Sequence, residues 1–414
     1  MIIVLIDALR YNRLGCYGYE KDTSPNIDAL SQQSLVFTNA VAQATWTKPS
    51  VVSLFTSKYV KDHGVVSNRG INISSDACPN CTTGDALPSE AVTLAEVLKT
   101  HGYKTKALIN NSILTRNFGL EQGFDEYWAS NPEPKQTTEA INWIKAHEDS
   151  KFFMYLHYLA PHAPYDPPSK YRKKFKQEYN GKFFFPGKTA PDYARIRLSP
   201  EEKDELMARY DGEISYVDHE FGRFVEFLRE QNLLQKTLLI VMADHGEALG
   251  ERGRIGHGFA FNTVAQVPLI VFPAPEHRRQ IIGDIIGVID LAPSILGWLG
   301  IKAPSDFKGN DISDSRGKEK KEFEFSRSSG NRCQIMRNKT HILKYYKRSK
   351  EIKLYDLRTD PFEFKDISKD NPELVKRFIS AYNLVNPDRD AIPVGAYAKD
   401  KESTEGLRAL GYLQ

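Results

Sequence analysis

The sequence predicts an α/β protein whose functional groups gather at the carboxyl end of a buried sheet. Two apolar runs, residues 2–6 and 238–242, indicate central strands, because strands of parallel sheets are buried on both faces. Asp7 follows the first run, and Asp244 and His245 follow the second. Ligands of open α/β sheets bind at the carboxyl ends of the strands, so these three side chains mark a candidate site.

Size and composition exclude several classes of protein. A chain of 414 residues has room for one large and one small domain, and 41% hydrophobic with 26% charged residues is typical of a soluble globular protein. The formal net charge of +3 gives no reason to expect a nucleic-acid partner. No apolar run approaches the roughly 20 residues of a membrane span. The best candidate, residues 285–301, is interrupted by Asp290 and Pro293.

The start of the chain and its cysteines bear on the cellular compartment. Met1 immediately precedes the first core strand, so the sequence shows no export signal. We expect a cytoplasmic protein if the chain is complete, and an exported one if an upstream signal was removed. Cys78 and Cys81 form a lone CxxC in a polar loop, which does not indicate a structural zinc site. A disulfide between them would require an oxidising compartment.

Residues 44–56 place a hydroxyl at the start of a helix. Pro49 suits a first helical turn, which sets Thr47 at the helix entrance, where free backbone N–H groups and the helix dipole favour an anion. Beside a metal ion, this hydroxyl could attack a phosphate or sulfate ester. The alternative is that Thr47 only caps the helix, and a capping role is equally ordinary for Asp7.

A glycine-rich segment follows His245 and carries a second histidine, His257, in Gly-His-Gly. Histidine and carboxylate are ordinary ligands of zinc, manganese and similar ions. The alternative for Asp244 and His245 is a capped strand end with a hydrogen-bonded histidine, since short motifs often occur by chance.

The chain changes character after about residue 300. The segment before Phe323 is rich in Asp, Ser, Gly and Lys, which indicates an exposed linker. Residues 323–357 alternate like short antiparallel strands, and a helix is expected after Asn371. We therefore expect a catalytic domain over residues 1–304, a linker over 305–321, and a small domain with a tail over 322–414.

These stretches together resemble the sulfatase family of the alkaline phosphatase superfamily. The resemblance implies a large α/β domain with a mostly parallel sheet between helices on both faces, and a small C-terminal α+β domain with an antiparallel sheet. It runs along nearly the whole chain, and its further matches are residues 59–65, 101–105, 123–127, 152–168, 210–218, 354–357, 360–361 and 407–412.

The nucleophile motif departs from the family pattern. Sulfatases carry Cys/Ser-x-Pro-x-Arg, and the first residue of that motif is oxidised to formylglycine. Here Thr47 stands at the modifiable position and Val51 stands at the arginine position. A threonine cannot give the aldehyde, because its Cβ already carries a methyl group. The resemblance therefore implies that Thr47 acts as an unmodified alcohol, as threonine does in related phosphodiesterases and phosphoethanolamine transferases.

The resemblance also implies one divalent ion. Its ligands would be Asp7, Thr47, Asp244 and His245. A bare hydroxyl is a weak nucleophile, and a bound metal ion lowers its pKa. Ala8 replaces the family's second aspartate, so the calcium site of sulfatases loses a carboxylate ligand here. Zinc or manganese is therefore favoured, with calcium or magnesium as alternatives. A second ion is left open, because Ala160 stands near the place where a further acid would be needed.

The candidate substrate-binding residues are His162, His257, Lys48 and Asn110. His257 falls where sulfatases carry a lysine that holds the sulfate, and it could bind anionic oxygens, protonate the leaving group or ligate a second ion. His162 matches the family's substrate histidine and is expected to protonate the leaving group. Lys48 could contact the anion, and a solvated lysine is the alternative. Asn110 and Ser112 stand at the positions of the family's other lysine and histidine, so two of the side chains that usually bind the sulfate are missing.

The sequence predicts a metal-dependent ester hydrolase with Thr47 as nucleophile. Its expected substrates are phosphate or phosphonate esters, either small molecules or derived from glycans or lipids. Sulfate ester hydrolysis is the alternative, which the family resemblance supports and both Thr47 and Val51 oppose. A phosphoethanolamine- or phosphoglycerol-type transferase and a non-catalytic family member are further alternatives. The sequence sets neither the leaving group nor the oligomeric state.

Overall fold

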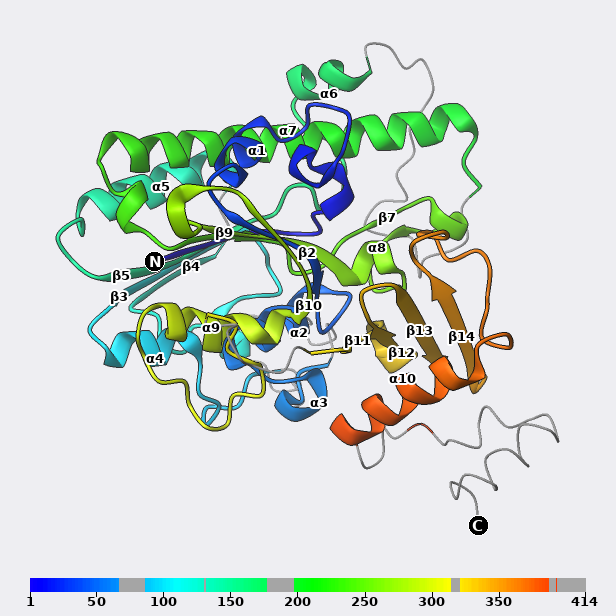
Figure 1. Ribbon diagram of the computed structural model, residues 1–414. Helices are drawn as coiled ribbons and strands as arrows, with labels where there is room; N and C mark the ends of the chain where they lie inside the picture. The colour runs from blue at the N-terminus through cyan, green and yellow to red at the C-terminus, as the bar shows by residue number, and fades with distance from the viewer. Residues whose placement is uncertain (67–85, 130–131, 177–196, 314–320, 387–391, 393–414) are drawn as a thin grey trace.

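The structure is a computed structural model that describes residues 1–66, 86–129, 132–176, 197–313, 321–386 and 392 (Figure 1). An eight-stranded sheet lies at the centre of the larger part of the molecule. Its strands are β1 (Ile2–Ile6), β2 (Leu35–Val41), β3 (Lys104–Ile109), β4 (Glu126–Ala129), β5 (Phe152–Tyr158), β6 (Leu239–Met242), β9 (Gln266–Phe272) and β10 (Gln280–Gly287). They are ordered β10-β2-β9-β6-β1-β5-β3-β4.

The sheet is mostly parallel, as the sequence predicts. Strand β1 pairs in parallel with both β5 and β6, whereas β9 runs antiparallel to its neighbours β2 and β6. Every residue of β1, β5, β6 and β9 is buried. This burial on both faces explains why the central strands are continuous apolar runs in the sequence.

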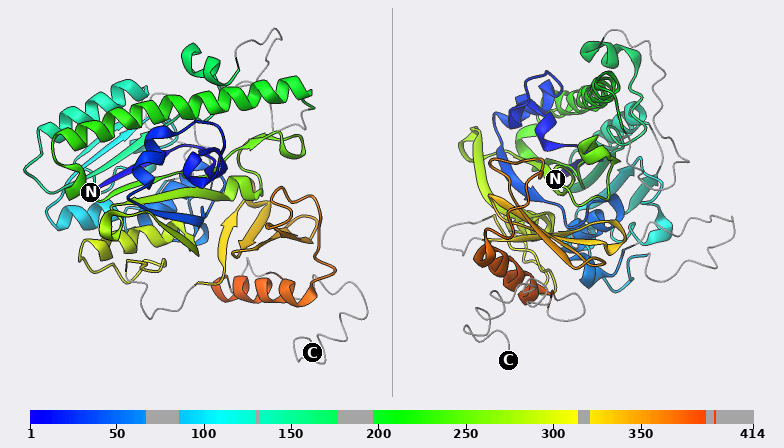
Figure 2. Two further views of the ribbon diagram at one scale, coloured as in Figure 1. Left: turned by 45° about the horizontal axis from the view of Figure 1, so that its top comes forward. Right: turned by 90° about the vertical axis from the view of Figure 1, so that its right-hand side faces the viewer.

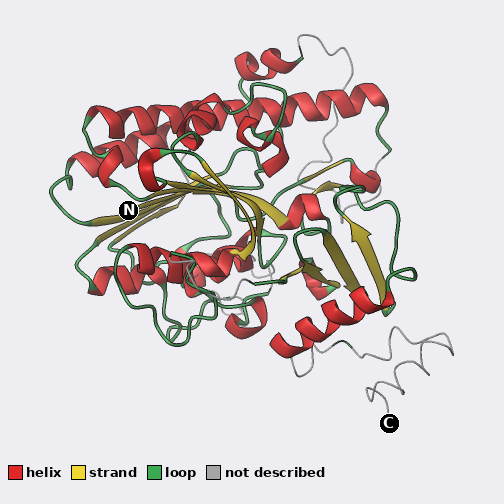
Figure 3. Ribbon diagram, in the orientation of Figure 1, coloured by secondary structure: helices red, strands yellow, loops and turns green. Residues whose placement is uncertain are grey.

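Helices cover both faces of the sheet (Figure 3). The longest, α7 (Pro200–Glu230), begins with a capping box in which Ser199 and Glu202 bond each other's backbone N–H groups. The other helices of this part are α1 (Pro25–Ser31), α2 (Thr47–Thr56), α3 (Val60–His63), α4 (Leu94–Thr100), α5 (Glu133–Lys145), α6 (Ser169–Phe175), α8 (Asn262–Ala265) and α9 (Leu291–Trp298). In the parts of the chain that the structure describes, no helix is long and apolar enough to cross a membrane.

A second, four-stranded sheet forms the C-terminal part of the molecule. Its antiparallel strands are β11 (Glu324–Arg327), β12 (Cys333–Arg337), β13 (His341–Tyr346) and β14 (Glu351–Asp356). Helix α10 (Pro372–Val385) lies along this sheet (Figure 2). Its Phe378 and Tyr382 belong to the apolar cluster between the helix and the strands. The antiparallel strands and the helix confirm the predicted fold, while the domain limits at residues 304 and 322 stay a prediction. Cys78, Cys81 and residues 407–412 lie outside the described residues.

Helix α7 buries a carboxyl group, that of Glu213, which is 6% exposed. Its Oε1 accepts a hydrogen bond from the backbone N–H of Asp166 at 2.8 Å. Burial raises the pKa of Glu213 to about 8, and this hydrogen bond opposes the rise only in part. The folded protein therefore keeps a proton on Glu213 at a pH where the unfolded chain has lost it.

We expect Glu213→Gln to become more stable relative to the wild type as the pH rises from about 5 to about 8. Across this window the wild type loses free energy of unfolding, by at most roughly 1.4 kcal/mol per pH unit, because only the folded state must hold the proton. Glutamine cannot ionise, so the variant escapes this loss. Urea unfolding across the window measures the difference, with Glu230→Gln, exposed at the end of the same helix, as control. If the difference in free energy of unfolding between Glu213→Gln and the wild type does not change with pH, the pKa of Glu213 is not raised in the folded protein.

Candidate functional site

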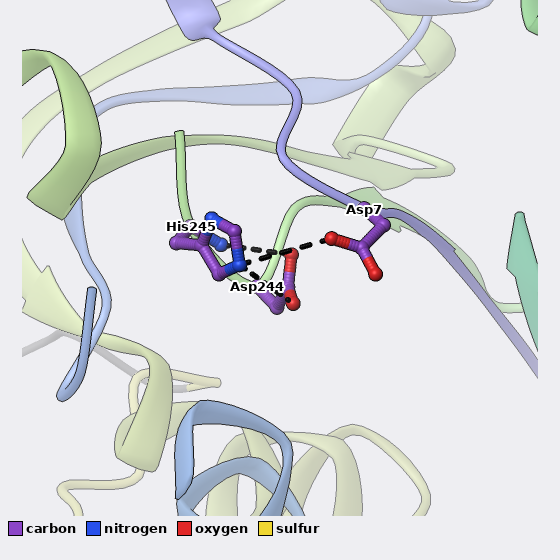
Figure 4. Close-up of side chains that lie close together, drawn as sticks. All are labelled: Asp7, Asp244 and His245. Carbon is purple, nitrogen blue, oxygen red and sulfur yellow. Dashed lines mark hydrogen bonds and ion pairs between the residues drawn. The ribbon is translucent and has the colours of Figure 1, made fainter. Parts of the chain in front are cut away.

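Two neighbouring strands end together and bring Asp7, Asp244 and His245 into one cluster (Figure 4). Asp7 follows β1, and the other two residues follow β6, which is hydrogen-bonded in parallel to β1. One possible ligand atom from each residue lies within 4.8 Å of the other two. All three side chains are buried. The parallel pairing of β1 with β6 therefore creates the cluster that the sequence predicts at this sheet edge.

Thr47 is the first residue of α2, and its side chain meets the cluster. Its Oγ1 lies 3.1 Å from Nε2 of His245, and the residue is 1% exposed. Trp46 occupies the N-cap position, so the interpretation of Thr47 as a helix cap is wrong. The hydroxyl of Ser50 donates to the carbonyl of Asp244 at 2.6 Å and ties α2 to the end of β6. The start of the helix is thus held against the two acids.

Hydrogen bonds define the chemical form of His245. Its Nδ1 lies 2.8 Å from the carbonyl oxygen of Gly246, which can only accept, so Nδ1 carries the proton and Nε2 has a lone pair. Burial and the positive charge of His257 hold the pKa of His245 well below its ordinary value. Nε2 lies 3.7 Å from Oδ1 of Asp7 and 3.4 Å from Oδ2 of Asp244. A neutral imidazole in this place is suited to bind a metal ion.

In each carboxylate of the cluster, one oxygen accepts two hydrogen bonds and the other accepts none from the described residues. Oδ1 of Asp244 accepts the backbone N–H groups of Ala8 and His245, at 3.2 and 2.9 Å, and Oδ2 of Asp7 also accepts two hydrogen bonds. Oδ1 of Asp7 and Oδ2 of Asp244 are buried with no hydrogen-bond partner among the described residues. Buried oxygens are rarely left in this state, and two of them beside a lone pair and a hydroxyl fit a divalent cation.

The two carboxyl groups oppose each other's ionisation. Burial, and next the charge of Asp7, raise the pKa of Asp244 well above its ordinary value. Burial also opposes ionisation of Asp7, yet the charge of His162 and a hydrogen bond from His157 hold its pKa below the ordinary range. A cation between the acids would favour the ionised form of both.

His257 lies against the ring of His245, with ring centres 4.3 Å apart, and 4.9 Å from the ring centre of His162. It follows β8 (Ile255–Gly256), which pairs with β7 (Ala248–Leu249) in a small hairpin. Its Nδ1 bonds to Oε1 of the buried Glu247 at 3.1 Å. Burial opposes protonation, but Glu247 nevertheless raises the pKa of His257 above its ordinary value. This raised pKa favours the imidazolium form of His257, in which Nε2 carries a proton.

The remaining residues predicted to bind substrate are His162, Lys48 and Asn110, and each has a different environment. Nδ1 of His162 donates to the carbonyl of Ala163 at 2.7 Å, which leaves Nε2 for the site. Lys48 is 1% exposed, with Nζ 3.9 Å from the ring centre of Phe118, so its interpretation as a solvated lysine is wrong. Nδ2 of Asn110 donates to Oε1 of Glu133 at 3.3 Å, and a role in substrate binding stays a prediction.

Three residues of the site were not predicted from the sequence: Asn111, His157 and Glu247. Asn111 and His157 both bond to Asp7. Asn111 lies just beyond the end of β3, and the same end-of-strand argument that selected Asp7 could have found it. His157 lies inside β5, where alternation alone does not assign a side, and no local pattern distinguishes Glu247 from other acids of the loop after β6.

Comparisons with known proteins identify the family of the chain. The chain matches the model of the family described as Sulfatase over residues 1–301, and that of N-sulphoglucosamine sulphohydrolase, C-terminal, over residues 250–380. An arylsulfatase from Clostridium perfringens is 21% identical over 89% of each chain.

Two solved structures show the same fold. One protein, solved in complex with its substrate D-glucosamine-2-N,6-O-disulfate, has a TM-score of 0.77 at 17% identity and covers 94% of this chain and 98% of its own. The phosphonate monoester hydrolase of Agrobacterium radiobacter has a TM-score of 0.73 at 18% identity, covering 93% of this chain and 94% of its own. At these identities the likeness concerns the fold alone.

We expect Zn²⁺ or Mn²⁺ to raise the melting temperature of the metal-free protein, and Asp244→Asn to remove most of the rise. The ion would meet the two unpartnered carboxylate oxygens, and a ligand at a thousandfold excess over its Kd stabilises the folded state by about 4 kcal/mol. Thermal unfolding with and without the ion and a chelator measures the shift. Asp22→Asn, which changes an exposed acid, is the matched control. An equal shift in wild type and Asp244→Asn would rule out Asp244 as a ligand.

Proposed function

The chain belongs to the sulfatase family and is an ester hydrolase, and on that premise we propose that it cleaves phosphate or phosphonate esters with Thr47 as nucleophile. The proposal rests on one observation: Oγ1 of Thr47 lies 3.1 Å from Nε2 of His245, beside the unpartnered oxygens of Asp7 and Asp244. The methyl group on Cβ of Thr47 rules out the formylglycine aldehyde, so the alcohol itself must attack.

Members of this family depend in general on a metal ion, and the residues that would hold one here are Asp7, Thr47, Asp244 and His245. Bound there, a divalent ion would lower the pKa of the hydroxyl and offset the negative charge of the ester. One nitrogen and three oxygens favour zinc or manganese, whereas calcium takes about six to eight oxygen ligands. Ala8, where sulfatases carry a further aspartate, supports this preference.

The proposed reaction passes through a covalent ester on Thr47. Its Oγ1 attacks phosphorus and loses its proton to water, while the bond between phosphorus and the leaving-group oxygen breaks. Nε2 of His162 protonates that oxygen, since Nδ1 is engaged by a backbone carbonyl. Water then hydrolyses the threonyl phosphate and restores the alcohol. The backbone N–H groups at the start of α2 stabilise the anionic oxygens.

His257 takes the place of the lysine that holds the sulfate in the family. Glu247 bonds Nδ1 and favours the imidazolium form, so that Nε2–H binds an anionic oxygen of the ester. Lys48 is buried beside Thr47 at the start of the same helix. A cationic His257 in contact with the ring of His245, and so near the nucleophile, suits an ester that carries negative charge.

Sulfate ester hydrolysis is the second candidate function. Membership of the sulfatase family and the likeness to the arylsulfatase from Clostridium perfringens favour it. The lack of a modifiable residue at Thr47 and of arginine at Val51 opposes it. A glycan ester is compatible with either reaction, since one solved relative binds a sulfated glucosamine.

We expect Thr47→Ala to lower kcat/KM for phosphate or phosphonate esters by at least about a thousandfold, and Thr47→Ser to retain part of the activity. Alanine lacks the attacking oxygen, whereas serine keeps it, and loss of a covalent nucleophile is among the largest single effects in catalysis. Turnover of aryl phosphate diesters, phosphonate esters and aryl sulfates, with wild type and both variants, ranks the substrates. Full activity in Thr47→Ala would refute the mechanism, and a preference for aryl sulfates would select the second candidate function.

We expect kcat/KM to fall as the pH rises through the raised pKa of His257, because loss of the proton removes a cation that binds the ester. In Glu247→Gln this fall should occur at lower pH, since Glu247 is the main favourable partner of the imidazolium. In His257→Lys it should move to higher pH, because lysine ionises at about pH 10.4. Profiles that coincide for all three proteins would show that His257 does not act as a cation.

A further inference from the structure

A buried chain of hydrogen bonds lies behind Asp7, on the side away from His245. Nε2 of His157 lies 3.1 Å from Oδ2 of Asp7 and donates to it, because the carboxylate can only accept. The hydroxyl of Tyr155 lies 2.9 Å from the other ring nitrogen, Nδ1. His157 is 0% exposed and Tyr155 is 1% exposed. The tyrosine hydroxyl and the carboxylate of Asp7 therefore hold the His157 ring from both of its nitrogens.

Asn111 supplies a second donor to the same oxygen. Its Nδ2 donates to Oδ2 of Asp7 at 2.7 Å. Its own Oδ1 accepts the backbone N–H of Ile113 at 3.0 Å, which defines the orientation of the amide. Oδ2 of Asp7 is thus satisfied by two oriented donors, and Oδ1 is left without a partner among the described residues.

The order of the strands produces this arrangement. Strand β5 lies between β1 and β3, and His157 is in register with Leu5 on one side and Ile109 on the other. Asp7 and Asn111 each stand two residues beyond those partners. Three adjacent strands therefore deliver one acid and its two donors to the same point.

We propose that Asn111 and His157, with Tyr155 behind His157, are positioning residues that turn Asp7 so that Oδ1 alone faces the metal ion. This inference rests on the metal site of the proposed function. Asp244 is constrained in the same way, because two backbone N–H groups occupy its Oδ1. Each acid then contributes a single oxygen, which keeps the site small and suits zinc better than calcium.

Strand β5 also contains a matched control. Tyr158 is as deeply buried as Tyr155, but its hydroxyl bonds to Oγ1 of Thr137 in α5, at 2.8 Å. Tyr155→Phe and Tyr158→Phe each remove one buried hydroxyl from the same strand. A loss of stability is expected from both variants, whereas a loss of metal affinity is expected only from the first.

Titration calorimetry of the metal-free protein with Zn²⁺ tests the proposal. We expect Tyr155→Phe and Asn111→Ala to raise the Kd for zinc by roughly 10- to 100-fold, the range found for residues that orient metal ligands. Tyr158→Phe should bind zinc like the wild type.

An unchanged Kd in Tyr155→Phe, together with a fall in melting temperature equal to that of Tyr158→Phe, would overturn the proposal, as would failure of the wild type to bind Zn²⁺. The proposed function fails by a different result. If Thr47→Ala keeps its turnover while Tyr155→Phe still loses zinc affinity, the nucleophile is wrong and the positioning residues are right.

Discussion

The confinement of two buried carboxylates at one sheet edge is the constraint on which the rest of the site depends. Asp7 and Asp244 follow paired parallel strands, so the backbone brings them together whatever their charges. Burial penalises each charge, and the two repel each other, as the raised pKa of Asp244 shows. An arrangement that costs stability in this way is expected at a functional site, where a cation can compensate for it.

The two histidines beside these acids, His245 and His257, differ in the protonation state that their surroundings favour. The lowered pKa of His245 favours its neutral form, with the lone pair turned toward the acids, and the carboxylate of Glu247 favours the cationic form of His257. Two imidazoles in ring contact thus have opposite protonation preferences, because their hydrogen-bond partners differ. Under the proposed function, one histidine of the pair holds the metal ion and the other binds the anionic ester.

Departures from the family pattern occur together in this chain. Threonine replaces the residue that becomes formylglycine, alanine replaces an aspartate of the calcium site, and histidine replaces the lysine that holds the sulfate. Under the proposed function, the first two changes replace an oxygen-rich calcium centre with a smaller metal site beside a plain alcohol, and the third changes the cation that binds the ester. The shared fold with both a sulfated-sugar enzyme and a phosphonate monoester hydrolase shows that this architecture accommodates either chemistry.

Local sequence patterns were enough to determine the central strands, the helix that starts at Thr47 and the antiparallel C-terminal sheet, because burial and helix entry leave marks within a few residues. They also placed Asp7, Asp244 and His245 at one edge, since parallel strands share their carboxyl ends. Only the tertiary structure decided which neighbours face the acids. Asn111 rather than Asn110 contacts Asp7, and this depends on the register between strands far apart in sequence, which no local pattern encodes.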